Sequence, residues 1–173
     1  MSFVHLHKHS HYSILSALAK PQQYVQIAIS QGSPAVALTY SGVMYGAIEF
    51  YKAAKSIGIK AILGVEMYIA PLGLTNKTPE NRYSSLILLA RNNEGYHNLL
   101  KLCTVAALKG FYYKPRVDDE VLAKYSSGLI ALSGSLGGNI PKTILENNLT
   151  GAKKQIEKYQ EILTRKGYYI QKE

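Results

Sequence analysis

Four of the chain's five histidines fall in one short stretch near the N-terminus. Single residues separate them, so in an extended strand all four imidazoles would point to one face. A row of imidazoles on one face is typical of a metal site, because neutral imidazole is a common ligand of transition metals. The first chemical hypothesis is therefore a metal centre at this end of the chain. The four residues are His5, His7, His9 and His11.

The segments that must position these histidines alternate between strand and helix patterns. Short, wholly apolar strands between helices predict a parallel sheet with helices outside it, and ligands bind such sheets at the C-terminal ends of the strands. A polar loop rich in breakers is expected at 72–82. Strands are expected at 3–7, 34–39, 60–71, 84–91, 129–134 and 168–172. Helices are expected after Pro21 up to Gly32, at 44–58, 93–110, 118–128 and 150–167 with Thr150 as a cap, and as a short turn of helix within 137–148.

The composition is that of one packed domain. The chain has 173 residues, of which 47% are hydrophobic and 18% charged. The sequence shows neither an apolar run of about 18 residues, which a membrane span needs, nor the pattern of a signal peptide. The single cysteine, Cys103, excludes an internal disulfide and fits a reducing cytoplasm. Its place on the apolar face of an expected helix indicates a core residue rather than a nucleophile.

The net charge of +9 favours a polyanionic partner such as nucleic acid, although the basic residues are dispersed, as on an ordinary basic surface. One loop mixes aromatic and basic residues and is a candidate nucleic-acid or interdomain contact, through stacking and phosphate pairing. The alternative is an internal tether in which Arg116 pairs with Asp118 or Asp119. The loop residues are Tyr112, Tyr113, Lys114 and Arg116.

Several segments, in this order, resemble the PHP domain (polymerase and histidinol phosphatase) at the N-terminus of the bacterial DNA polymerase III alpha subunit. The resemblance covers essentially the whole chain and implies a distorted β/α barrel. Residues 1–173 would form its N-terminal, incomplete part, without the polymerase domains. The segments are "FVHLHKHSHYSILSALA", "ALTYSGVMYGAIEFYKAAKSIGIKAILGVEMYIAP", "ILLARNNEGYHNLLKL", "GFYYKPRVDDEVLAKYSSGLIALSGSLGG" and "GAKKQIEKYQEI".

The resemblance also implies a cluster of metal ions bound by His, Asp, Glu and Cys at the strand ends. His7, His9 and Glu66 match family ligands, and these three could still hold one zinc or manganese ion. Alternatively, the two histidines are hydrogen-bonded relics in a refilled pocket. The other ligand positions carry neutral residues, which cannot offset the charge of a multi-metal cluster. Those positions are Ser16, Tyr40, Ser41, Ser85 (or its neighbour Ser84) and Ser135.

By the same resemblance, the parent protein is a cytoplasmic DNA-directed DNA polymerase, a nucleotidyltransferase that uses magnesium and binds DNA. Within it, we expect this segment to be catalytically inactive by itself. It would stabilise the remaining polymerase domains and dock the proofreading exonuclease subunit of the replicase holoenzyme. Two alternatives stay open. One is a residual metal-dependent phosphoesterase or 3′–5′ exonuclease that uses His7, His9 and Glu66, and the other is a nucleic-acid binding module.

Overall fold

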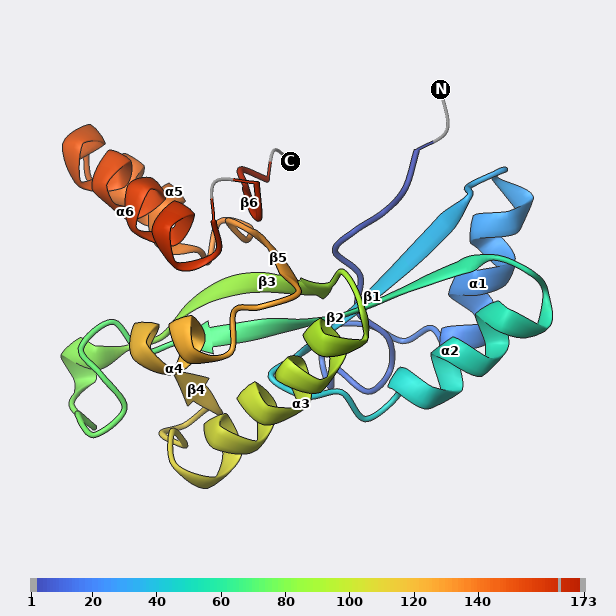
Figure 1. Cartoon of the computed structure of the whole chain (residues 1–173), viewed down its shortest axis with the longest axis horizontal. Helices are drawn as coiled ribbons and strands as arrows, with labels where there is room; N and C mark the ends of the chain where they lie inside the picture. The colour runs from blue at the N-terminus through green and yellow to red at the C-terminus, as the bar shows by residue number, and fades with distance from the viewer. Residues whose placement is uncertain (1–2, 165, 172–173) are drawn as a thin grey trace.

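The computed structural model describes residues 3–164 and 166–171 and has a six-stranded sheet with helices packed against it (Figure 1). The strand order is β1-β2-β3-β5-β6, and β4 pairs with β2. The strands are β1 (Ala35–Ser41), β2 (Lys60–Ile69), β3 (Ser84–Ala90), β4 (Arg116–Val117), β5 (Leu129–Leu132) and β6 (Tyr168–Tyr169). The helices are α1 (Pro21–Ser30), α2 (Ala47–Ser56), the 3-10 helix η1 (Pro79–Asn81), α3 (Asn93–Leu108), α4 (Asp119–Lys124), α5 (Asn139–Leu145) and α6 (Leu149–Ile162).

The sheet is parallel except for β3, which is antiparallel to both of its neighbours, β2 and β5. The expectation of a purely parallel sheet is therefore wrong at this strand. A parallel connection needs a crossover, usually a helix, whereas the polar loop between β2 and β3 contains only the short turn of η1. The described strands β1 and β6 are the two ends of the path and do not pair, so the sheet is open, as expected for an incomplete barrel.

The helices cover one face of the sheet. Alternate residues of each strand point to this face, and their apolar side chains pack against the helices. Val65 and Met67 of β2 belong to a buried cluster with residues of α3, α4 and α6. Leu38 and Tyr40 of β1 pack in the same way with residues of α1 and α2. Since successive side chains of a strand point to opposite faces, Glu66 and other intervening residues face the side that these helices leave open.

The expected first strand at 3–7 is not a regular strand. This segment lies along β1, where the N–H of Ala37 donates to the carbonyl of His5 and the N–H of Thr39 donates to the carbonyl of Lys8. Between these two hydrogen bonds the N-terminal segment moves on by three residues, from His5 to Lys8, whereas β1 moves on by two, from Ala37 to Thr39. The extra residue has the effect of a bulge, which interrupts a ladder and redirects side chains. The four histidines consequently do not share one face.

The ends of the C-terminal elements also differ from the expectation. Helix α6 is capped by Asn148, whose side chain accepts a hydrogen bond from the N–H of Gly151, and not by Thr150. The helix ends at Ile162, before the expected stop at 167. Strand β6 covers two residues of the expected 168–172, and residue 172 lies outside the described residues. Strand β4 was not expected, because two residues are too short to give a periodic pattern.

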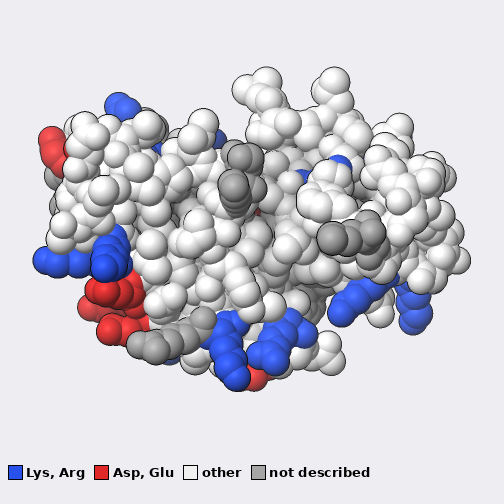
Figure 2. Space-filling model, turned by 90° about the horizontal axis from the view of Figure 1, so that it is seen from above, with Lys and Arg blue, Asp and Glu red and all other residues white. Residues whose placement is uncertain are grey.

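Basic side chains lie mostly at the margins of the face seen in Figure 2. Among the described residues on this face, Lys and Arg gather at the edges and the centre is largely uncharged. A track of cations along which a nucleic-acid backbone would run is therefore not visible on this face. No helix in the described part of the chain is both long and apolar enough to cross a membrane.

Gly95 gives a test of how closely α3 approaches the turn before β5. Its N–H is capped by the Oδ1 atom of Asn92 at 2.9 Å, and an added Cβ would clash with the carbonyl oxygen of Gly128. Alanine usually stabilises a helix by about 0.5–1 kcal/mol relative to glycine. We nevertheless expect Gly95→Ala to lower the free energy of unfolding in urea by about 1–3 kcal/mol, because the backbone must shift.

The matched control is Gly137→Ala. A Cβ at Gly137 would meet only the Oγ atom of Ser85, at 3.4 Å, which is an ordinary contact. The free energy of unfolding of this variant should stay within about 0.5 kcal/mol of the wild type. Equal stability of the two variants would show that the close approach at Gly95 is not present in solution.

Candidate functional site

His7, His9 and Glu66 converge on the face of the sheet that the helices leave open. The two Nε2 atoms of the histidines are 3.2 Å apart, and Nε2 of His9 lies 3.5 Å from Oε2 of Glu66. Nitrogen and oxygen ligands of zinc lie at about 2.0–2.2 Å, which in tetrahedral coordination places neighbouring ligand atoms roughly 3.3–3.5 Å apart. One ligand atom from each residue lies within 4.8 Å of the others. The three side chains, called the trio below, therefore have the spacing that one zinc ion needs.

Two neighbouring strands and the N-terminal segment build the trio. Glu66 of β2 lies opposite Ser41 of β1 in the parallel register, and the N–H of Gly42 donates to the carbonyl of Glu66 at 2.8 Å. The extra residue in the N-terminal segment brings His7 and His9 over this point. Strand β1 ends at Ser41 and β2 ends at Ile69, three residues after Glu66, so the site is near the C-terminal edge where parallel sheets bind their ligands.

Hydroxyl groups hold His9 and Glu66 in place. The Oγ atom of Ser13 lies 3.1 Å from Nδ1 of His9 and accepts the backbone N–H of Ser41 at 3.2 Å. The Ser41 hydroxyl donates to Oε2 of Glu66 at 3.1 Å. In the tautomer of His9 that has its proton on Nδ1, this nitrogen donates to Ser13, and the Nε2 lone pair faces the other two members of the trio. Imidazoles that bind metals are commonly oriented in this way by a partner on the other ring nitrogen.

Burial lowers the pKa of His9 below its ordinary value of 6.5. The carboxylate of Glu66 opposes this shift and the neighbouring His7 adds to it. Only 19% of the His9 side chain is exposed. The imidazole is consequently neutral at pH 7, which is the state that coordinates a metal.

The lowered pKa of His9 predicts a pH dependence of stability. The unfolded chain takes up a proton at about 6.5, before the folded chain does, so the contribution of His9 is fully present above that pH. It is lost as the pH falls through 6.5 toward the folded pKa. Between about pH 7.5 and about pH 5.5, the wild type should therefore lose more free energy of unfolding than His9→Asn does.

Urea unfolding at the two pH values measures this difference. His97→Asn, at an exposed position on α3, controls for the removal of a histidine as such and should behave as the wild type. Identical pH dependence of the wild type and His9→Asn would contradict the burial of a neutral imidazole at this position.

The neutral residues at the family's ligand positions lie in different places. Ser41 is next to the trio, but Tyr40 points to the opposite face, where it is 1% exposed and its ring contacts that of Tyr12 edge-on. The side chain of Ser16 is exposed, and Ser13, which the sequence did not indicate, is the serine beside His9. Its signal would have been its place four residues after His9.

Ser85 and Ser135 belong to the part of the edge formed by β3 and the loop after β5. Because β3 is antiparallel, its start lies at the same edge as the end of β2, with Ser85 opposite Tyr68. The N–H of Ser85 approaches the carbonyl of Gly137 at 3.4 Å, and the N–H of Gly138 donates to the carbonyl of Ser135. These two serines thus lie at the correct edge of the sheet, with hydroxyls in place of ionisable ligands.

Gln171 joins the two ends of the chain at the trio. Its Nε2 atom lies 3.1 Å from Nδ1 of His7, and its backbone N–H donates to the Oγ atom of Ser133 at 2.9 Å. Sequence reasoning missed this residue, because a contact between positions 7 and 171 depends on the sheet bringing β6 beside the N-terminal segment. The signal available in the sequence was a polar residue immediately after an expected strand.

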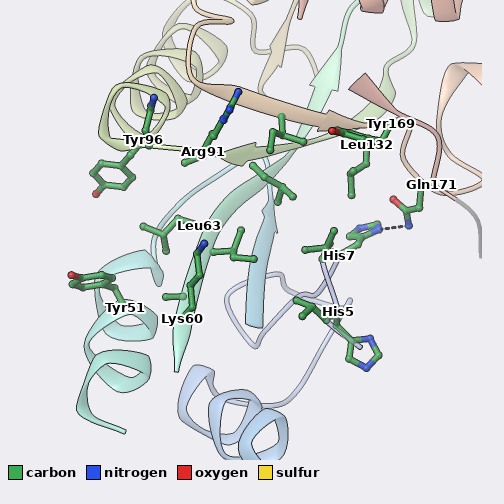
Figure 3. A pocket seen from close by; sticks show the side chains of 18 of the residues that line it. His5, His7, Tyr51, Lys60, Leu63, Arg91, Tyr96, Leu132, Tyr169 and Gln171 are labelled. Atoms are coloured by element: carbon green, nitrogen blue, oxygen red, sulfur yellow. Dashed lines mark hydrogen bonds between the residues drawn. The ribbon is translucent and has the colours of Figure 1, made fainter. Parts of the chain in front are cut away.

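An open groove of about 1090 Å³ reaches His7 from the inner side of the sheet (Figure 3). Apolar side chains such as Leu63 and Leu132 line it. Lys60 and Arg91 lie toward the end away from His7 and Gln171 (Figure 3). His7 therefore borders a largely apolar groove that carries cations at its far end.

The aromatic-basic loop at 112–116 does not act as one surface. Arg116 is completely buried, and its guanidinium donates to the carbonyls of Gly110, Asn81 and Asn76 at 3.1, 2.8 and 3.4 Å. It does not pair with either candidate aspartate: Asp118 caps α4, and Asp119 pairs with Lys158 at 2.8 Å. Tyr113 and Lys114 are exposed, whereas Arg116 is inaccessible to a nucleic-acid phosphate.

The remaining candidates are not brought to the trio. Three histidines are exposed, and rings of His5 and His11 contact the neighbouring aromatic residues instead. Burial raises the pKa of the Cys103 thiol to about 12, so it is not a thiolate nucleophile at pH 7. The exposed histidines are His5, His11 and His97.

Residues 5–171 match the family model for the PHP domain. The chain is 44% identical over 174 residues to the DNA polymerase III subunit alpha of Treponema pallidum, covering 99% of this chain and 15% of that protein. It is 46% identical over 157 residues to the same subunit of Borreliella burgdorferi, covering 89% of this chain and 14% of that protein. The chain thus spans about one seventh of the length of these relatives.

Among solved structures, the chain is similar to an amidohydrolase from Chromobacterium violaceum, described with bound sulfate and without metal. The TM-score is 0.55 at 14% sequence identity, and the match covers 96% of this chain and 84% of that one. At this identity the similarity supports the fold: a mixed α/β sheet of the barrel type that is not closed here.

Proposed function

Because the chain belongs to the PHP domain family, we propose that it is the PHP segment of a bacterial DNA polymerase III alpha subunit. Its role there is chiefly that of a scaffold for the rest of the polymerase. The observation that carries this proposal is 44% identity to such a subunit over 99% of the chain. The parent protein would then be a DNA-directed DNA polymerase that uses magnesium, with the acidic residues for nucleotide transfer outside this chain.

We further propose that the trio binds a single zinc or manganese ion. Two imidazoles and a carboxylate form a donor set that is known for zinc, and the short spacings between their ligand atoms suit one ion. Zinc bound with an open position supplies a Lewis acid and a water of lowered pKa. His9 is neutral at pH 7, and Ser13 and Ser41 hold the ligands in place, so little reorganisation is needed before binding.

The serines at the other ligand positions favour a structural ion over a catalytic cluster. Ser41, Ser85 and Ser135 offer neutral hydroxyls, which are weak ligands for divalent ions and do not balance a second or third charge. A multi-metal hydrolase places two ions about 3.5–4 Å apart on anionic ligands. Glu66 is the one carboxylate in the metal-binding group found among the described residues, which favours a single ion at this group.

A one-ion phosphoesterase or 3′–5′ exonuclease is the second candidate. The observation that favours it is the groove, which reaches His7 and carries Lys60 and Arg91 at its far end. A substrate phosphate would approach His7 along this groove. The proposal of a structural ion predicts instead that the loaded chain releases no nucleotide from a mismatched primer.

The scaffold role also predicts covered surfaces. Ile14, Leu15 and Leu18, in the loop just after the histidines, are 83%, 103% and 97% exposed. Exposed aliphatic side chains close together are typical of a contact surface. We propose that another domain of the same polymerase chain packs on this loop, since the chain covers only 15% of its relative from Treponema pallidum.

An antibody against this chain tests the main proposal. The polypeptide it recovers from the source cells should extend a primer with four deoxynucleotides and magnesium. A recovered 19.1-kDa polypeptide without polymerase activity would contradict the proposal. For the second candidate, the purified chain loaded with zinc or manganese is incubated with a mismatched primer end, and nucleotide release that is lost in His7→Ala would favour the exonuclease.

A further inference from the structure

The amide of Gln171 is held against His7 by the fold. Its Nε2 atom lies 3.1 Å from Nδ1 of His7, as Figure 3 shows by a dashed line. The backbone N–H of Gln171 donates to the Oγ atom of Ser133, directly after β5. The side chain therefore reaches His7 from an anchored backbone rather than from a free end.

This contact assigns one proton in the trio for the amide orientation that the structure has. In that orientation the amide nitrogen donates, so Nδ1 of a neutral His7 accepts and its proton is on Nε2. That proton points to Nε2 of His9 at 3.2 Å, and the Nδ1–H of His9 points to Ser13. Every ring nitrogen thus has a partner, but the proton between the two Nε2 atoms occupies the place that a metal ion would take.

Ligation through both Nε2 atoms requires the other tautomer of His7, with its proton on Nδ1. The same amide serves this tautomer after half a turn, because its Oε1 atom then accepts the Nδ1–H. Glutamine is able to support both tautomers. A glutamate at this position supports only the metal-binding tautomer, and a leucine supports neither.

We propose that Gln171 is a positioning residue that orients the ring of His7 and accepts its Nδ1 proton when zinc binds, and thereby sets the affinity of the trio for zinc. This inference rests on the proposed one-ion site. Partners that orient a ligating histidine typically change metal affinity by about 10–100-fold when they are removed. Gln171 differs from the trio in that it acts only through His7.

The test combines nitrogen NMR of the histidine rings with zinc calorimetry on the chain of residues 1–173. In the metal-free wild type, His7 should carry its proton on Nε2, and in Gln171→Glu on Nδ1. Gln171→Leu should bind zinc at least about 10-fold more weakly than the wild type. Gln171→Glu should bind it as tightly or more tightly, because the binding tautomer is already formed.

Gln26→Leu is the matched control, since Gln26 is exposed on α1. Its zinc affinity should equal that of the wild type, and thermal melts verify that all variants fold. Unchanged zinc affinity in Gln171→Leu, or an unchanged His7 tautomer in Gln171→Glu, would overturn the role of Gln171 alone. Absence of zinc binding by the wild type would instead overturn the proposed one-ion site, and the proposed effect of Gln171 on zinc affinity would fall with it.

Discussion

Replacing Arg116 with methionine is expected to lower the free energy of unfolding by about 3–5 kcal/mol, the range for breaking a buried charge interaction. The guanidinium is completely buried and donates to three backbone carbonyls, those of Gly110, Asn81 and Asn76. Methionine fills similar space but leaves the carbonyls of Gly110 and Asn81 without the guanidinium donor, whereas the carbonyl of Asn76 keeps the Asn81 amide as a donor. Each unsatisfied buried group costs about 1–3 kcal/mol.

Arg116 is the centre of an ordered loop rather than a surface cation. Asn81, also completely buried, accepts the N–H of Leu72 and donates to the carbonyls of Gly73 and Asn76. Together, Arg116 and Asn81 hold the connection between β2 and β3 against β4. For a chain of this size, the expected loss lowers the thermal midpoint by roughly 6–20 °C.

Arg82→Met is the matched control, because Arg82 is exposed and close to the same loop. Its free energy of unfolding should stay within about 0.5 kcal/mol of the wild type. Arg116→Lys should recover only part of the loss, since an ammonium cannot span carbonyls as a planar guanidinium does. If Arg116→Met were as stable as Arg82→Met in urea unfolding, the buried tether would not exist.

The sequence predicted most of the helices and strands because their apolar periodicity is strong. The sequence did not predict the direction of β3, because this direction depends on the connection between β2 and β3 and not on the residues of the strand itself. The signal was nevertheless present: a loop at 72–82 without a helical pattern cannot carry a parallel crossover. The irregular N-terminal segment could not be foreseen, because the extra residue between His5 and Lys8 is defined only by its pairing with β1.

The trio could be inferred because its residues follow family motifs at strand ends. The hydrogen-bond partners of the trio could not be inferred from the sequence. Ser13 is only four residues from His9, but serines are common and nothing in the pattern selects Ser13 over Ser16. Gln171 is 164 positions from His7, and only the folded sheet brings them together. For Arg116 the sequence predicts a surface contact or a pair with Asp118 or Asp119, since charged residues are seldom buried without a partner of opposite charge.

Glu66→Gln is expected to weaken zinc binding by about 100-fold or more, because even removal of a partner of a ligand costs about 10–100-fold. The substitution keeps the size of the side chain and its contact with the Ser41 hydroxyl but removes the charge that offsets the ion. Zinc at 100 times its dissociation constant should stabilise the wild type by about 2.7 kcal/mol. At the same concentration, zinc should stabilise Glu66→Gln by at most about 0.4 kcal/mol, so its thermal midpoint should rise by only a small fraction of the wild-type shift.

His5→Ala is the control for this measurement, since His5 lies in the same run of histidines but is exposed. It should retain the full zinc-dependent rise of the thermal midpoint, whereas His9→Ala should lose it as Glu66→Gln does. A rise that persists in Glu66→Gln and disappears in His5→Ala would place the ion on the exposed imidazoles. The convergence of His7, His9 and Glu66 would then be a hydrogen-bonded remnant, as in the alternative interpretation of the two histidines.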